Sequence, residues 1–220
     1  KTAYDFTKLP LAWVRKNMTV TGERTWRELR GEACKPIQIH PKPKKMIGTA
    51  KSFGKRLESL ELIEEACAYY ISEISEVLRA QNSCASYVRV FVATNYHSKI
   101  DQQYFNSKTV KMPIPTNNTF ELTSMARKAL HAIYKPGYRY KKVGVDLSGI
   151  VPHDQIQGNL FEKPSKFKPE LMKTVDALNS KYGKATVSSA MIGTRKNEWE
   201  LIKKERSPRY TTQWEELLRI

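Results

Sequence analysis

The 220-residue sequence lacks any apolar run approaching the roughly 20 residues that span a bilayer. It also lacks a positively charged start followed by an apolar core, so we expect no signal peptide. No basic amphipathic helix favours an anionic membrane surface. These absences predict a protein without a membrane partner.

The arrangements that carry catalysis are missing as well. No Ser/His/Asp or Cys/His set can be defended, there is no glycine-rich phosphate loop, and the four histidines are scattered. Metal-dependent phosphoryl transfer needs several converging carboxylates, whereas the acidic doublets at 64–65 and 215–216 are typical of solvated faces. The residues alone therefore predict a binding module with no catalytic residue, no metal and no cofactor.

Cysteine is scarce, and its number is odd. Cys34, Cys67 and Cys84 are far apart in the sequence. This pattern favours reduced thiols that serve as small apolar residues, and hence a cytoplasmic protein.

Positive charge, in contrast, is abundant. The formal net charge is +16. Residues 1–56 hold 14 Lys/Arg against 4 Asp/Glu, so +10 of this excess lies at the front of the chain. A field of this sign attracts polyanions, with nucleic acid as the first expectation and charge for solubility alone as the alternative.

The chain divides into five predicted segments. Residues 1–33 show apolar spacing typical of short helices, and 34–45 form a basic, proline-rich linker. This linker could follow a phosphate backbone or simply be solvated. Residues 46–150 form a folded domain, 151–168 a second linker, and 169–220 a C-terminal extension with a helix, a short strand at 185–193 and a tail.

Residues 46–150 alternate between strand and helix patterns in the order β-α-β-β-α-β. The expected strands are 46–53, 86–94, 108–114 and 139–147, and the expected helices are 59–80 and 118–134, the latter capped by Asn118. This order predicts an α+β, ferredoxin-like fold whose antiparallel sheet has both helices on one face.

The period of two along each strand predicts what the other face presents. If the valines of 86–94 point toward the helices, Arg89 points away. The same reasoning turns Lys111, Tyr140 and Lys142 outward, with Phe91 as a further candidate. This set is more cationic than aromatic, which favours contact with phosphates and duplex shape over base stacking.

Several motifs resemble one known family in their order along the chain. They are "SFGKRL", "YRYKKVGVDLSGI", "QGNLF", "LMKTVDALNSKYG" and the closing "SPRYTTQWEELLRI". The chain resembles UmuC-type Y-family DNA polymerases, the ImpB/MucB/SamB group that includes the catalytic subunit of polymerase V. By this resemblance, 1–33 is a thumb remnant, 46–150 the little finger domain, and 169–220 the C-terminal extension.

The resemblance implies an error-prone translesion polymerase that acts in SOS repair and mutagenesis. In that family the carboxylates that bind Mg²⁺ lie in the palm, which precedes the thumb. We therefore expect this chain to be a fragment or processed piece, inactive alone, that grips primer–template duplex DNA. The expected DNA-binding residues are Lys51, Ser52, Phe53, Gly54, Lys55, Arg56, Arg89, Lys111, Tyr140, Lys141 and Lys142.

A bare Leu-Phe pair stands in the polar linker 151–168. UmuC-type proteins carry a sliding-clamp-binding motif here, of the form Gln-Leu-x-Leu-Phe. The resemblance therefore implies clamp contacts from Gln157, Asn159, Leu160 and Phe161. Gly158 replaces the usual apolar residue, so we expect weaker binding. Alternatively, the pair fastens the linker to the chain's own surface.

Further partners implied by the resemblance are the processed UmuD dimer and RecA, which we assign to no residue. Two other functions stay open at this point. One is a stand-alone RNA-binding regulator of ferredoxin-like fold, and the other is a protein-interaction scaffold.

Overall fold

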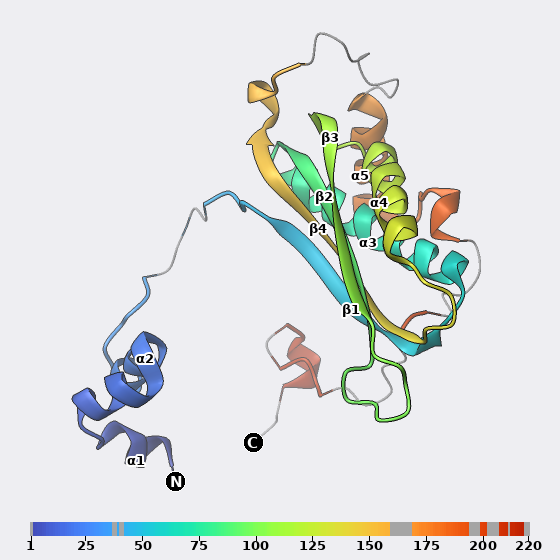
Figure 1. Ribbon diagram of the computed structural model, residues 1–220. Coiled ribbons are helices and arrows are strands. Elements are labelled where there is room, and N and C mark those ends of the chain that lie inside the picture. Colours follow the sequence, from blue (N-terminus) through green and yellow to red (C-terminus); the bar gives the residue numbers. More distant parts are fainter. Residues whose placement is uncertain are drawn as a thin grey trace. The chain divides into compact units, whose positions relative to one another are not determined.

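The computed structural model describes the chain except for residues 1, 37–38, 40–41, 159–168, 194–198, 202–206, 211 and 218–220. It shows two compact units, Lys1–Pro43 and Lys44–Ile220 (Figure 1). In the described part of the chain, every helix is too short or too polar to cross a lipid bilayer.

The first unit is helical, as the apolar spacing predicted. Helix α1 spans Ala3–Thr7 and begins with a capping box, in which the side chains of Thr2 and Asp5 each accept from the other residue's backbone N–H. Helix α2 spans Leu11–Glu28 and is kinked at Thr19, where φ is 58°.

The second unit contains a four-stranded sheet. Its strands are β1 (Ile47–Leu57), β2 (Ser83–Thr94), β3 (Phe105–Thr116) and β4 (Tyr140–Pro152). The spatial order is β1-β4-β2-β3, and all neighbours are antiparallel. Strand β4 thus lies between β1 and β2, and β2 lies between β3 and β4. These split βαβ units confirm the α+β, ferredoxin-like prediction.

Helices α3 (Leu60–Ala80) and α4 (Thr119–Ile133) cover one face of this sheet (Figure 1). The Ser59 hydroxyl caps α3, and the Asn118 side chain accepts from two backbone N–H groups of α4, as expected. Both helices turn their apolar residues toward the sheet, where they meet the inward residues of the strands. The fully buried strand residues include Val88, Val90, Val92, Val143, Val145 and Leu147.

Tyr140 contradicts the predicted alternation, because its side chain is fully buried. The register of β4 shifts next to it on both sides, where it pairs with Thr94 of β2 and Leu57 of β1. This irregularity reverses the face on which Tyr140 would otherwise lie. Its hydroxyl donates to the carbonyl of Lys135 at 2.9 Å, and its ring is 6.1 Å from that of Tyr104.

The C-terminal extension packs on α3 through helix α5 (Pro169–Tyr182). Arg79 of α3 holds Asp176 in a bidentate pair, with N–O distances of 2.6 and 2.7 Å. Met172 is buried beside them. The spacing of Leu171, Val175 and Leu178 predicts an apolar stripe along this helix, but Leu171 is 45% exposed. The packed side of α5 therefore includes Met172 and excludes Leu171.

The strand predicted at 185–193 was wrong. A 3-10 turn, η2 (Ala190–Ile192), contacts α3 instead, and Gly193 after it has φ of 85°. Trp199 then joins the core and packs against the rings of Tyr69 and Tyr70, at centroid distances of 5.2 and 5.6 Å. Further 3-10 turns are η1 (His153–Gln155) and η3 (Trp214–Glu216), and the Trp214 side chain is 86% exposed.

Candidate nucleic-acid interface

The sheet face opposite α3 and α4 is the main candidate surface, here called the open face. The strand register places its residues in rows across the four strands. Its members are Gly48, Ala50, Ser52, Lys142, Gly144, Asp146, Ser148, Tyr87, Arg89, Phe91, Ala93, Phe105, Ser107, Thr109 and Lys111. The members on β1 are all small, whereas β2 and β3 carry the aromatic side chains of this face.

Three cations lie on the open face where the alternation predicted them. Lys111 is exposed and Lys142 is half-buried, and neither forms an ion pair with any described residue. Arg89 lies 3.9 Å from the carboxylate of Asp146, its neighbour on β4. The lysines are therefore available to an external anion, whereas Arg89 is partly neutralised.

Aromatic side chains on the open face are more numerous than predicted. The candidate Phe91 does face outward, and Tyr87 and Phe105 lie on the same face. Tyr87 is 38% exposed and Phe105 is 64% exposed. The expectation of a face that is mainly cationic was therefore wrong for its β2–β3 half.

A second basic region, here called the basic end, lies where β1 ends, β4 begins and the β2–β3 loop turns (Figure 1). Arg56 and Arg139 both pair with Asp101 of that loop, the former at 2.6 Å, and the Asp101 side chain is 1% exposed. Burial alone would raise the pKa of Asp101. The hydrogen bond with Ser98 and the charges of the two arginines outweigh burial, so the pKa of Asp101 lies below its ordinary value. One buried carboxylate thus fixes two guanidinium groups that are each about two-fifths exposed.

The predicted phosphate turn at 52–54 is instead part of strand β1. The Phe53 side chain is fully buried, and its carbonyl accepts a hydrogen bond from the Lys141 ammonium at 2.5 Å. The Gly54 amide donates to the carbonyl of Trp199 at 3.2 Å. A Cβ at Gly54 would lie 2.5 Å from the Glu200 carbonyl oxygen. Gly54 is thus needed because the backbone of Glu200 approaches it closely. Its amide is used by the Trp199 carbonyl and not offered to a phosphate.

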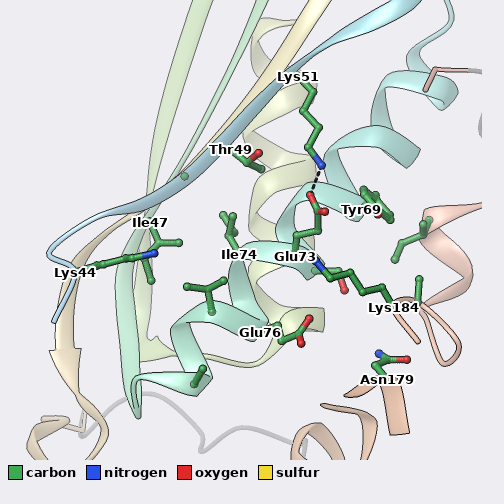
Figure 2. Close-up of a pocket in the computed structure, with 16 residues that line it drawn as sticks. Lys44, Ile47, Thr49, Lys51, Tyr69, Glu73, Ile74, Glu76, Asn179 and Lys184 are labelled. Atoms are coloured by element: carbon green, nitrogen blue, oxygen red, sulfur yellow. Dashed lines mark hydrogen bonds and ion pairs between the residues drawn. The ribbon is translucent and has the colours of Figure 1, made fainter. Parts of the chain in front are cut away.

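Lys51 lies on the helix side of β1 and not on the open face. Its ammonium pairs with Glu73 of α3 at 2.6 Å (Figure 2). It also lies 5.1 Å from the centroid of the Tyr70 ring. The pair borders a cavity of about 470 Å³ between β1, α3 and residues of the C-terminal extension such as Asn179. Of the predicted DNA-binding side chains, Lys51, Phe53 and Tyr140 therefore do not reach the open face.

The remaining predicted residues divide between the two regions. Ser52, Arg89, Lys111 and Lys142 lie on the open face, and Lys55, Arg56 and Lys141 lie at the basic end of the sheet.

Sequence reasoning missed Tyr87, Phe105, Asp101 and Arg139. Tyr87 is two residues before Arg89, so the same alternation could have found it. Phe105 lies outside the predicted strand 108–114, because β3 begins three residues earlier. Asp101 is in a loop, where no periodicity indicates its partners.

The predicted clamp-binding residues are only partly described. Gln157 and Gly158 are exposed, and a Cβ at Gly158 would meet open space. Asn159, Leu160 and Phe161 lie outside the described residues. Within the described chain, no group of three His, Cys, Asp or Glu side chains could hold a metal ion.

Comparison with known proteins gives two matching domains. The C-terminal domain of the impB/mucB/samB family matches residues 44–160, and a domain of unknown function matches residues 169–220. Protein ImpB of Salmonella typhimurium is 34% identical over 98% of this chain and 51% of its own length. Protein UmuC of the same species is 34% identical over 100% and 52%, and Protein MucB of Escherichia coli is 33% identical over 97% and 50%.

The chain thus spans about half the length of the curated relatives it matches. The family match covers more than half of the chain and includes all four strands and both helices of the sheet domain. The chain belongs to the impB/mucB/samB family, and its residues 44–160 are that family's C-terminal domain.

Proposed function

We propose that this chain is the DNA-gripping part of a translesion DNA polymerase that acts in SOS mutagenesis in the cytoplasm. Its open face and basic end hold primer–template duplex through the phosphate backbone. The observation that carries the proposal is the pair Lys111 and Lys142, which lie on the face opposite the helices without an ion-pair partner among the described residues. Family membership and the net charge of +16 support it.

Phosphate contacts position a protein on DNA but read little sequence. The free lysines and the two arginines fixed by Asp101 are of this kind, because a guanidinium keeps further N–H donors for phosphate oxygens. We therefore expect the chain to bind duplexes of unrelated sequence with similar affinity.

The test is the affinity for a fluorescent primed duplex, measured by anisotropy. A Lys111→Ala/Lys142→Ala variant should lose binding at least tenfold. The matched control is Lys128→Ala/Lys173→Ala, which removes two exposed lysines from helices α4 and α5. Equal loss in both double variants would reject the open face and leave only a net-charge effect.

Nucleotide addition is assigned to another part of the polymerase. With Mg²⁺, deoxynucleotides and a primed template, the 220-residue chain should extend no primer. Extension by a preparation free of other polymerases would overturn this assignment. The processed UmuD dimer and RecA, which the family resemblance implies as partners, remain without assigned residues.

We also propose that the segment from Gln157 to Phe161 binds a sliding clamp. Two adjacent apolar anchors can enter a hydrophobic groove while the glutamine bonds at its rim. A Gly158→Leu variant would restore the apolar position, and the open space around Gly158 admits it. It should bind purified clamp more tightly, whereas Phe161→Ala should abolish binding. Unchanged affinity in both would indicate that the pair serves the chain's own surface.

A further inference from the structure

Three aromatic side chains of the open face form a strip along β2 and the start of β3. This aromatic strip consists of Tyr87, Phe91 and Phe105. The rings of Phe91 and Phe105 are 6.0 Å apart with an interplanar angle of 40°. Phe105 is 64% exposed and Tyr87 is 38% exposed, so neither ring is fully used in packing within the described structure.

Two rings of the strip lean over glycines of β4. A Cβ at Gly144 would lie 2.2 Å from Cε1 of Phe91, and a Cβ at Gly149 would lie 2.7 Å from Cδ2 of Tyr87. The missing side chains let the rings lie close to the sheet backbone. A ring held in this way can offer its outer π-face to a planar ligand.

Cations alternate with the rings of the strip. The Arg89 guanidinium lies 5.8 Å from the Phe91 centroid, and its buried Nε has no hydrogen-bond partner in the described structure. Lys111 is exposed, and it lies directly opposite Tyr87 in the register of β2 and β3. Aromatic faces interleaved with cations are how proteins bind single strands, because bases stack on the rings while phosphates meet the charges. A duplex keeps its base faces inside the stack and cannot use such rings.

We propose that the aromatic strip binds unpaired bases of single-stranded DNA by stacking. The inference rests on the proposed function, since it assumes that DNA meets the open face, and it extends that function to a second ligand class. Lys111 and Lys142 serve the phosphates of either form. Phe91 and Phe105 add a contact that only unpaired bases can make.

The first experiment places a reporter in the strip. A Phe105→Trp variant of the 220-residue chain is titrated with oligothymidine of about 16 nucleotides. Stacking should quench the fluorescence of the new tryptophan, and the unsubstituted chain gives the background from the four native tryptophans. The same titration with a blunt duplex should quench it far less.

The second experiment separates stacking from charge. Phe105→Ala should weaken oligothymidine binding about tenfold. It should leave the slope of log affinity against log salt unchanged and alter duplex affinity less than twofold. Tyr182→Ala is the control, since Tyr182 is similarly exposed at 62% but belongs to α5. Circular dichroism verifies that each variant folds.

The outcomes distinguish the two proposals. If Phe105→Ala is neutral and Phe105→Trp is not quenched, while the lysine variant still loses duplex binding, the stacking inference fails and the proposed function stands. If the lysine variant is neutral as well, both fail. Tighter binding of oligouridine than of oligothymidine would overturn the assignment to DNA.

Discussion

Replacing Trp199 by alanine tests whether the C-terminal extension and the sheet domain form one folded unit. Trp199 follows a long connection after α5, yet its side chain is 2% exposed. Its ring packs against Tyr69 and Tyr70 of α3, and its carbonyl accepts the Gly54 amide of β1 at 3.2 Å. One residue of the extension thus contacts both a helix and an edge strand of the sheet domain.

The expected loss follows from these contacts. Truncation of a buried Trp to Ala costs about 3–5 kcal/mol of unfolding free energy. The buried Nε1 of Trp199 has no hydrogen-bond partner in the described structure, so removal of this unpaired donor recovers part of that loss. We therefore expect a decrease of about 3 kcal/mol for Trp199→Ala, and a smaller decrease for Trp199→Phe, which keeps an aromatic ring at this position.

Urea denaturation followed by circular dichroism measures the decrease, and hydrogen exchange of the Gly54 amide gives a local readout. Exchange at Gly54 should accelerate in Trp199→Ala. Trp214→Ala is the matched control, because that side chain is 86% exposed and should change stability by less than about 0.5 kcal/mol. Equal stability of the Trp199 and Trp214 variants, with unchanged Gly54 exchange, would refute the reasoning.

Two further predictions follow, one on the packing of α5 against α3 and one on the reactivity of the three cysteine thiols. Asp176→Asn should destabilise the chain by about 2–4 kcal/mol in urea, because it leaves the Arg79 guanidinium, 11% exposed, without its carboxylate; a change below about 0.5 kcal/mol would contradict a docked α5. Burial raises the pKa of Cys67 to about 12 and that of Cys84 to about 11, so both stay protonated at pH 8. A thiol reagent at that pH should modify Cys34 quickly and the other two only on unfolding; three equal fast rates would contradict this.

The secondary structure of the sheet domain was largely predictable from the sequence. Its helices carry strong apolar periodicity, and Asn118 marks the start of α4, so their type and limits were read correctly. The inward apolar residues of β2, β3 and β4 determined which residues face outward wherever the pairing is regular. Arg89, Lys111 and Lys142 were found in this way.

The failures arose where local patterns do not determine contacts. Tyr140 lies next to a shift of register that depends on β1 and β2 together, and no period within β4 shows it. Lys51 reads as a surface cation, but its face of β1 is the one that meets Glu73 of α3. The sequence suggested that Gly54 lets a phosphate approach the backbone. What approaches Gly54 in the structure is the backbone of Glu200, which is distant in sequence.

The salt dependence of duplex binding tests the central claim most directly. Each phosphate neutralised by a lysine contributes about 0.9 to the slope of log affinity against log salt. The chain should show a steep negative slope, and Lys111→Ala/Lys142→Ala should make it shallower by about 2. The Lys128→Ala/Lys173→Ala control should keep the original slope. A flat response in the unsubstituted chain, or identical slopes in all three proteins, would contradict an open face that follows the phosphate backbone.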